Sequence, residues 1–346
     1  MFDDLEIERL SREDDAPAFA EVRNFLNANS LDLEDGIELF VVIRQGTRIV
    51  ACAGLEANIV KCVATDPLYR GEGLALKVVT EVINLAYENS HAHLFLYTRP
   101  NNLATFARCG FYPIVEVSGI VALMENTPVG IGSYCADLRK LRREGPVVGS
   151  IVVNANPFTL GHRFLVEQAA RQCDTLHLFV VAEDASFFPY RERFDLVRAG
   201  VAGIPNLILH PGSQYMISRA TFSSYFFKEK NVVGDCFTAV DLLIFREHIA
   251  PALGITHRFV GTEPFCRTTN KYNQDMKYWL QADLSSAAPI TVVEIRRTEY
   301  NSVPISASEV RRLLAKNDFA QITNLVPPTT LALLETKYRD PRLSAA

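Results

Sequence analysis

The sequence has few of the residues that build disulfide frameworks or metal-templated domains. Its seven cysteines are odd in number, scattered along 346 residues, and form no C-x-x-C pair. We therefore expect reduced, mostly buried thiols rather than disulfides. Its seven histidines form no H-E-x-x-H or similar helix-spaced set, which argues against a tight structural zinc site.

Long apolar runs and a large excess of charge of one sign are also missing. The most apolar stretches, such as 176–182, fall far short of the ~20 residues that cross a bilayer. The first ten residues are acidic and lack the basic and apolar segments of a secretory signal. With 35 basic and 40 acidic residues the net charge is −5, which disfavours a broad surface for nucleic acid or anionic membranes. We expect a cytoplasmic protein with neither as a partner.

The length and composition suit two globular domains. A chain of 346 residues, 48% hydrophobic and 22% charged, is long enough for two domains of roughly 100–200 residues, each with its own core. A basic run at 139–143, just before Gly145 and Pro146, is typical of a solvated linker. These observations place one domain at 1–130, a linker at 131–146 and a second domain at 147–346.

The first domain has the pattern of a mixed α+β unit. Runs rich in β-branched residues at 38–44, 47–53 and 59–65 predict an antiparallel meander with a turn at Gln45-Gly46. A glycine-containing loop at 66–73 precedes a helix that the apolar spacing predicts over 74–87. A strand at 93–97, a short helix at 103–108 and a strand at 111–117 complete the pattern.

The second domain alternates apolar strands with amphipathic helices. We expect strands at 147–153, 176–181, 207–210, 258–260 and 290–295, and helices at 161–173, 192–202 and 272–281. The segment 308–337 is predicted to be helical apart from a break at Pro327-Pro328. Such alternation is typical of a parallel sheet that is covered on both faces.

The strongest local signal is the loop at 154–162, Asn-Ala-Asn-Pro-Phe-Thr-Leu-Gly-His, between the first strand and first helix of the second domain. Ligands of open α/β sheets bind at the carboxyl ends of the strands, where this loop would lie. The helix N-terminus offers unpaired N–H donors, Gly161 allows close approach, and His162 can donate to a phosphate oxygen. The same residues also fit a simple turn and helix cap, because Asn-Pro forms turns and Thr caps helices.

A second candidate element opens a helix late in the chain. Ser306, with Glu309 three residues later, has the spacing of a capping box. The functional interpretation is that Ser306 and Ser308 at a helix N-terminus, with Arg311 one turn later, bind the oxygens of a triphosphate. The two elements together are far more specific than either alone.

Together they resemble the (T/H)-x-G-H nucleotidyltransferase superfamily. The matching residues are Thr159-Leu160-Gly161-His162 and the late I-S-x-[ST]-x-x-R motif of Ile305, Ser306, Ser308 and Arg311. Within it, the loop at 154–162 and the segments 188–194 and 261–266 resemble the citrate lyase ligase family closely. Val153 and Ala155 replace the glycine and aromatic residue usual in the wider superfamily, which argues against a generic cofactor adenylyltransferase.

The first domain resembles the acyl-CoA N-acetyltransferase fold. The resemblance depends on Arg70-x-x-Gly73-x-Ala75 in its strand-loop-helix setting and on the segment 102–111. In that fold the glycine loop binds the pyrophosphate of coenzyme A; the same residues could also form a plain helix-capping turn. Phe106 stands where such enzymes often carry a tyrosine that protonates the thiolate, which favours binding over acetyl transfer to an amine.

These resemblances imply an α/β protein with an N-acetyltransferase-like domain followed by a Rossmann-like nucleotidyltransferase domain. The implied activity is ATP-dependent acetylation, through acetyl-adenylate, of the prosthetic thiol of the citrate lyase acyl carrier protein, with AMP and pyrophosphate released. The implied substrates and cofactors are ATP, Mg²⁺, acetate and the carrier with its dephospho-CoA-type group. The implied site residues are His162, Thr159 and Arg311 for catalysis; Asn156, Pro157, Phe158, Gly161, Ser306 and Ser308 for ATP; and Arg70, Gly71, Gly73 and Ala75 for the pyrophosphate of the prosthetic group.

Several alternatives stay open at this level. The same motifs fit a nucleotidyltransferase that adenylates a phosphorylated cofactor precursor, an N-acetyltransferase with an ATP-sensing module, or a non-enzymatic nucleotide-binding module. Arg191 and Arg193 could reach phosphates but more commonly lie at the surface, and Glu183 and Asp184 could hold Mg²⁺ through water. The role of Glu263 is undetermined. His177 and His257 are expected at strand edges.

Overall fold

A computed structural model describes residues 5–182, 186–218, 234–263 and 267–339. The chain divides into two compact units, an N-terminal unit (Met1–Gly132) and a C-terminal unit (Ser133–Ala346). The candidate Mg²⁺ ligands Glu183 and Asp184 and the segment 264–266 lie outside the described residues.

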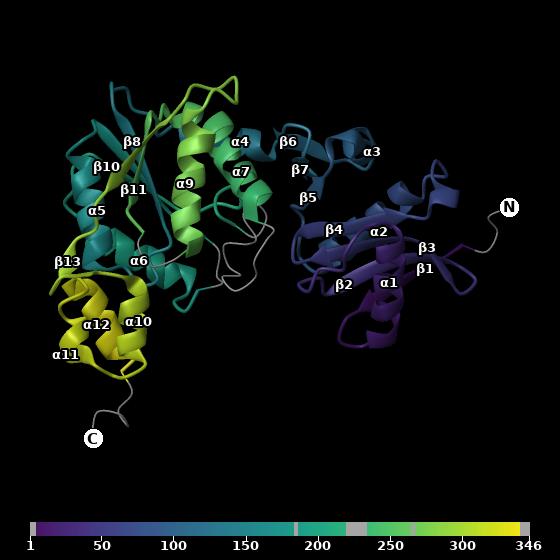
Figure 1. The fold of residues 1–346 in the computed structure, drawn as a ribbon, viewed down its shortest axis with the longest axis horizontal. Coiled ribbons are helices and arrows are strands. Elements are labelled where there is room, and N and C mark those ends of the chain that lie inside the picture. Colours follow the sequence, from purple (N-terminus) through teal and green to yellow (C-terminus); the bar gives the residue numbers. More distant parts are fainter. Residues whose placement is uncertain (1–4, 183–185, 219–233, 264–266, 340–346) are drawn as a thin grey trace. The chain divides into compact units, whose positions relative to one another are not determined.

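The N-terminal unit is built around a seven-stranded sheet of order β1-β2-β3-β4-β5-β7-β6 (Figure 1). Its strands are β1 (Leu5–Ser11), β2 (Leu39–Gln45), β3 (Arg48–Glu56), β4 (Ile59–Thr65), β5 (Phe95–Thr98), β6 (Tyr112–Val117) and β7 (Val121–Glu125). Its helices are α1 (Ala16–Ala28), α2 (Leu74–Glu88) and α3 (Leu103–Arg108). The antiparallel pairing of β2 with β3 and of β3 with β4 confirms the predicted meander.

Each face of this sheet buries its own core, because neighbouring residues of a strand point to opposite sides. Val41 and Ile43 of β2 pack with the apolar stripe of α2. Phe40 and Val42 of the same strand pack with the residues Phe19, Val22 and Leu26 of α1. The two helices therefore cover opposite faces of the sheet.

The sheet opens between β4 and β5. These two strands run parallel but pair only at Ile59 with Phe95 and at Val60 with Leu96. Beyond Val60 the strand β4 continues to Thr65 without pairing to β5 and leads into the glycine loop before α2. The loop therefore follows the strand that borders the opening.

The C-terminal unit has a five-stranded parallel sheet of order β10-β9-β8-β11-β12. The strands are β8 (Val148–Val153), β9 (Thr175–Val180), β10 (Leu207–His210), β11 (His257–Gly261) and β12 (Thr291–Ile295). The helices are α4 (Gly130–Arg139), α5 (Leu160–Ala170), α6 (Tyr190–Gly200), α7 (Gly234–Ile244), α8 (Ala250–Leu253), α9 (Arg267–Gln281), α10 (Ala307–Leu314), α11 (Phe319–Ile322) and α12 (Pro328–Lys337). Helix α4 begins at the end of the N-terminal unit and occupies much of the predicted linker. The expected parallel sheet is confirmed.

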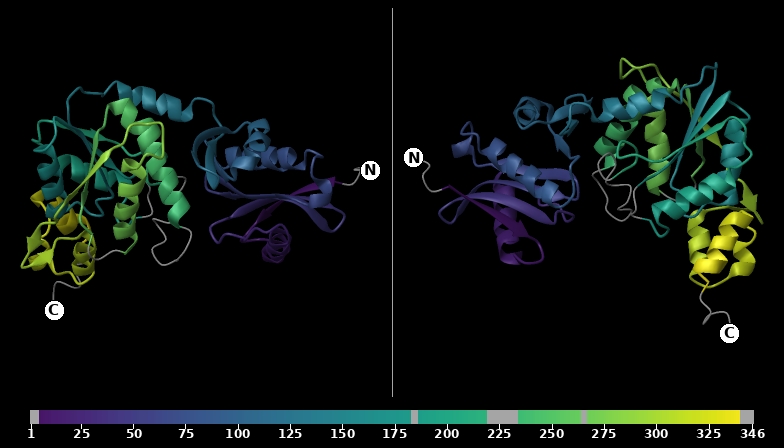
Figure 2. Two further views of the ribbon diagram at one scale, coloured as in Figure 1. Left: turned by 45° about the horizontal axis from the view of Figure 1, so that its top comes forward. Right: turned by 180° about the vertical axis from the view of Figure 1, so that it is seen from behind.

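Helices cover both faces of this sheet, as Figures 1 and 2 show. On one face Ile151, Val153 and Phe259 pack with α5 and α6. On the other face Arg258 lies over the ring of Phe245, which follows α7. The strand order reverses between β8 and β11, so the crevice at their carboxyl ends is where such sheets bind ligands.

The last three helices form a small layer beside the sheet, drawn in yellow in Figures 1 and 2. Pro328 begins α12, as the predicted break at the Pro-Pro pair requires. A second break separates α10 from α11, where Asp318 accepts a hydrogen bond from the amide of Gln321 as the N-cap. The segment 308–337 is thus three helices rather than two.

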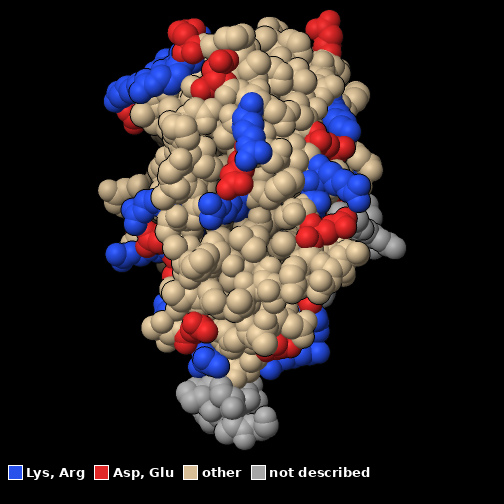
Figure 3. All heavy atoms as spheres, turned by 90° about the vertical axis from the view of Figure 1, so that its left-hand side faces the viewer, with Lys and Arg blue, Asp and Glu red and all other residues tan. Residues whose placement is uncertain are grey.

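Charges of both signs are mixed on the face of the C-terminal unit drawn in Figure 3, where Lys and Arg side chains alternate with Asp and Glu. That face offers no extended basic surface among its described residues. Within the described parts of the chain, no helix combines the length and apolar composition required to cross a membrane.

Candidate functional site

Described residues of the C-terminal unit form a cavity of about 740 Å³ at the ends of β8 and β11. It is lined by the loop after β8, the first turn of α5, the end of β11 and the start of α10. This volume is in the range of small-molecule sites. Of the predicted ATP-site residues, seven line it: Asn156, Thr159, Gly161, His162, Ser306, Ser308 and Arg311. Pro157 and Phe158 are buried beside it and do not line it.

Thr159 and His162 form a capping box at the start of α5. The backbone amide of Thr159 donates to Nδ1 of His162 at 3.0 Å, and the amide of His162 donates to Oγ1 of Thr159 at 3.3 Å. Because Nδ1 accepts a hydrogen bond, the proton of the neutral imidazole is assigned to Nε2. Burial and the positive charge of Arg297 lower the pKa of His162 to about 4. His162 is therefore neutral at pH 7 and presents an N–H donor at Nε2.

The first turn of α5 keeps one backbone donor for a ligand. The amide of Leu160 donates to the carbonyl of Leu325 at 2.9 Å, and that of His162 is used by Thr159. Within the described chain no acceptor is bonded to the amide of Gly161. A helix N-terminus with a free amide attracts anions through both the donor and the helix dipole.

Arg193, which is fully buried, fixes the loop before α5 through hydrogen bonds. Its NH1 donates to the carbonyl and the Oδ1 of Asn154, each at 2.9 Å, and to the carbonyl of Val181 at 2.8 Å. The expectation that Arg193 is a surface charge is therefore wrong, because these carbonyls replace the water that the guanidinium loses on burial. Arg191, in contrast, is exposed.

Gly161 allows the late segment to approach the helix α5. A Cβ atom at this position would lie 3.0 Å from the carbonyl oxygen of Ile305 and 3.5 Å from its Cβ. Backbone from the segment before α10 therefore packs directly on the first turn of α5. This contact brings the two candidate motifs together across 144 residues of sequence.

Arg311 on α10 also connects the two motifs. Its NH1 donates to the backbone carbonyl of Asn156, and its NH2 donates to Oγ of Ser308 at 3.2 Å. Ser306 caps α10 by accepting from the amide of Glu309 at 3.1 Å. The carboxylate of Glu309 binds Arg312, so only half of the predicted capping box is present.

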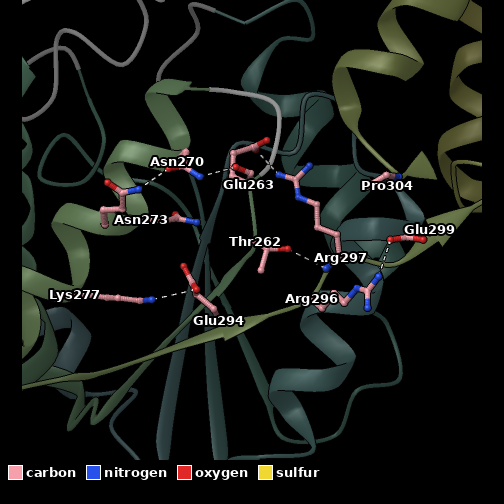
Figure 4. A pocket seen from close by; sticks show the side chains of 11 residues that line it. Thr262, Glu263, Asn270, Asn273, Lys277, Glu294, Arg296, Arg297, Glu299 and Pro304 are labelled. Carbon is pink, nitrogen blue, oxygen red and sulfur yellow. Dashed lines mark hydrogen bonds and ion pairs between the residues drawn. The ribbon is translucent and has the colours of Figure 1, made fainter. Parts of the chain in front are cut away.

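Arg296 and Arg297 are among the further basic residues that line the cavity and that were not predicted from the sequence. Arg296 and Arg297 follow β12, and Arg297 binds the carboxylate of Glu263 at 2.5 Å. Figure 4 shows this pair between the end of β11 and the segment after β12, in a hollow of about 550 Å³ that shares both residues with the main cavity. The signal that could have found Arg297 is its position after a parallel strand. Glu263, whose role was undetermined, fixes this arginine.

The N-terminal unit places its glycine loop at the start of α2. Gly71 and Gly73 have φ values of 92° and 77°, in the region that favours glycine. Within the described residues no acceptor is bonded to the amides of Gly71, Gly73 or Ala75, and Arg70 is exposed beside them. Phe106 is buried in the core against α2. The loop therefore has the donors of an anion site, and the position of Phe106 supplies no hydroxyl.

Three of the described histidines, His177, His210 and His257, lie on strands of the C-terminal sheet. His177 is fully buried on β9, an interior strand, so the expectation of a strand-edge position is wrong for it. Its Nδ1 lies 2.8 Å from Nε2 of His210 on β10. Burial lowers the pKa of His177 to about 4 and that of His210 to about 3. His257 bonds to Oγ1 of Thr256 at 2.8 Å.

Other ligating groups are dispersed. Among the described residues no three His, Cys, Asp or Glu side chains gather as a metal-binding group. Cys52, Cys62, Cys109, Cys135 and Cys173 are free thiols. Burial raises the pKa of each of them, so they are poor nucleophiles at neutral pH.

Comparison with known proteins matches both units. Residues 148–334 match the family described as citrate lyase ligase C-terminal domain, and residues 3–111 match the acetyltransferase (GNAT) family. A citrate (pro-3S)-lyase ligase of Escherichia coli is 53% identical over 327 residues, which cover 94% of this chain and 93% of that protein. The ligase of Klebsiella pneumoniae is 49% identical, covering 95% of this chain and 96% of that protein. The ligase of Haemophilus influenzae is 47% identical, covering 96% of this chain and 98% of that protein.

Proposed function

The chain belongs to the citrate lyase ligase family, and we propose that it uses ATP to acetylate the prosthetic-group thiol of the citrate lyase acyl carrier protein. The observation that carries the proposal is the meeting of the two motifs in one cavity, where Arg311 bonds to the carbonyl of Asn156. Family membership supports a ligase activity, and the cavity holds donors and cations that can bind phosphate oxygens.

The proposed reaction has two steps. A carboxylate oxygen of acetate attacks the α-phosphorus of ATP, the bond to the β-phosphate oxygen breaks, and acetyl-adenylate and pyrophosphate form. The carrier thiol, losing its proton, then attacks the acetyl carbonyl, and AMP leaves. Both steps depend mainly on positioning and on stabilising negative oxygens.

His162 and the first turn of α5 are proposed to bind the reacting phosphate. The Nε2–H of His162 and the free amide of Gly161 are neutral donors in the same cavity. Neutral donors stabilise charge that develops on the phosphate without being lost to titration near pH 7. Thr159 is 1% exposed and its hydroxyl is bonded to His162, so it acts as a positioning residue for the imidazole.

The basic side chains are proposed to hold the departing pyrophosphate. Ser308 and Arg311 lie on the first turns of α10, and Ser306 caps that helix. An arginine fork binds paired phosphate oxygens better than a single ammonium does. Arg297, held by Glu263, adds a further cation beside His162.

Mg²⁺ would accompany the triphosphate rather than occupy a protein cage. Glu263 and Glu309, the carboxylates of the cavity, are bound to Arg297 and Arg312. The ion prefers a few protein oxygens together with phosphates and water. When bound it would neutralise charge on the triphosphate.

The N-terminal unit is proposed to bind the dephospho-CoA-type group of the carrier. The loop Arg70–Ala75 offers backbone amides and a cation for its pyrophosphate. A buried Phe106 supplies no acid for an amine acetyltransferase. Gly73→Asp should raise the KM for the carrier while leaving adenylation unchanged, and an unchanged KM would remove this role from the loop.

ATP–pyrophosphate exchange tests the adenylation step without a carrier. Purified protein with ATP and labelled pyrophosphate should incorporate label only when acetate is added. Exchange that needs a phosphorylated cofactor precursor instead of acetate would favour the alternative, a nucleotidyltransferase. If neither acetate nor the precursor supported exchange, both the adenylating ligase and the nucleotidyltransferase would be overturned.

A further inference from the structure

Among the described residues of the C-terminal unit, three arginines are almost completely buried, and two of them have clear structural partners. Arg193 is bonded to the carbonyls of Phe188, Asn154 and Val181. Arg246 donates to the carbonyls of Trp279, Ala282, Ala287 and Ala288. In each case backbone oxygens replace the water that the guanidinium loses on burial.

Arg258 is different. It is 3% exposed, yet its Nε and NH1 have no hydrogen-bond partner among the described residues. Its guanidinium carbon lies 4.5 Å from the centre of the Phe245 ring, which supports the cation from one face only. A buried charge whose donors have no hydrogen-bond partner is costly, and each such group in a native protein calls for an explanation, of which a bound ligand is one.

The idle donors belong to the ATP cavity. Arg258 lines the same 740 Å³ cavity as His162, on the face of the sheet opposite to the α5 core. Asp241 and the hydroxyl of Tyr272 lie near Arg258, but the Asp241 oxygens accept from the amide of Ile217 at 2.6 Å and from Tyr272 at 2.7 Å. Asp241 therefore lowers the cost of the buried cation without bonding to it.

Buried apolar side chains line the same cavity as Arg258. Ile217 and Met276 line the cavity and are 5% and 1% exposed. Ile217 has a φ of 41°, an outlier for a β-branched residue, and its amide is held there by Asp241. Strained backbone that its surroundings enforce clusters at active sites, ligand clamps and switch regions.

We propose that Arg258 binds the carboxylate of the acid substrate, a short unbranched aliphatic acid whose methyl group packs against Ile217 and Met276. The inference deepens the proposed adenylation and depends on it for the identity of the acid. The fork of the guanidinium would take both carboxylate oxygens before one of them is transferred to phosphorus. The apolar walls would limit the length of the acid.

Binding of ¹³C-acetate to the full chain, measured by saturation-transfer NMR, tests this site independently of turnover. Arg258→Met keeps the bulk and removes the charge, and it should weaken acetate binding roughly 10- to 100-fold. Arg258→Lys should recover part of the affinity, because it restores charge without the fork. Arg198→Met removes an exposed arginine of α6 and serves as the matched control, with acetate affinity unchanged.

The outcomes separate the two ideas. Acetate binding that is equal in wild type and Arg258→Met, or absent from the wild type, overturns the role of Arg258. Binding that depends on Arg258, without acetate-dependent ATP–pyrophosphate exchange, keeps the carboxylate site and overturns the adenylation. In exchange assays Arg258→Met should raise the KM for acetate while the KM for ATP stays within about twofold.

A second variant tests the apolar wall. Met276→Ala enlarges the space beside Arg258 and should raise the ratio of kcat/KM for propionate over acetate roughly tenfold, the discrimination that one methylene provides. An unchanged ratio would exclude Met276 from the acid pocket. Because the measured quantity is a ratio between two substrates, a general loss of stability alone cannot produce the expected result.

Discussion

The backbone amide of Thr159 donates to Nδ1 of His162 at 3.0 Å, so the residue that caps the helix also fixes the tautomer of the imidazole. The proton is then on Nε2, the atom that would face a phosphate. The same four-residue sequence can therefore cap the helix and supply the donor that the proposed function requires. This explains why the capping interpretation and the phosphate interpretation of the loop are compatible.

The first prediction concerns the donor at Nε2. His162→Ala should lower kcat of acetate-dependent exchange about 10²- to 10³-fold, as loss of one transition-state donor does. His162→Gln, whose side-chain amide can reach the same position, should keep part of the activity. The dissociation constant for ATP should change much less than kcat. A loss of ATP binding equal to the loss of rate would show that His162 serves ground-state binding instead.

The second prediction concerns pH and stability. The pKa of His177 is lowered to about 4 and that of His210 to about 3, below the ordinary value of 6.5. The unfolded chain therefore binds protons more readily, so stability is complete above about pH 6.5 and falls as the pH drops toward the folded values. One such histidine accounts for roughly 2 kcal/mol between pH 7.5 and pH 5.

Urea unfolding at several pH values measures this effect. The free energy of unfolding should decline below pH 6.5 in the wild type, and NMR should show the two imidazoles neutral at pH 5. Imidazole resonances that titrate near pH 6.5 in the folded protein would contradict the prediction. The double variant His177→Phe/His210→Phe should show a shallower decline if it folds.

The arrangement of the main elements could be predicted from the sequence, and the elements that were not predicted have physical reasons for it. Strands β8 to β12 are strongly apolar, and their alternation with helices predicts the parallel sheet. The edge strand β1 was not predicted because most of its residues are polar and exposed. Helix α7 was not predicted either, since its sequence is apolar without a clear amphipathic stripe.

The site was predictable only as far as its motifs extend. The late Ser306–Arg311 motif and the loop at 154–162 meet because both lie at the same end of the sheet. Arg258 could not be found in this way, because an arginine within a strand gives no sign of which groups will surround it. That its Nε and NH1 lack partners among the described residues depends on the packing of separate elements, such as Phe245, around it.

The third prediction concerns the arginine that joins the two motifs. Arg311→Lys keeps the charge but cannot bond at once to the carbonyl of Asn156 and to Ser308. The KM for pyrophosphate in the exchange reaction should rise about tenfold or more, and the KM for acetate should stay nearly constant. Parallel increases in both values would indicate a general distortion of the cavity rather than a role toward pyrophosphate.

The fourth prediction concerns Gly161. An alanine Cβ would lie 3.0 Å from the carbonyl oxygen of Ile305, so the segment before α10 must shift by a few tenths of an ångström. The shift moves Ser306 and Arg311 relative to His162, and kcat for exchange should fall at least tenfold, since small misplacements of catalytic groups have large effects. The free energy of unfolding should change little, because the higher helix propensity of alanine, about 1 kcal/mol over glycine, offsets the cost of this shift.

Gly132→Ala is the matched control for this change. Gly132 lies in helix α4, has no atom within 4 Å of the added Cβ and has no positive φ. Its substitution should leave exchange kinetics unaltered while offering the same gain in helix propensity. If Gly161→Ala retained full activity, direct packing of Ile305 on α5 would not be what aligns the two motifs, and the contact of Arg311 with Asn156 would have to align them alone.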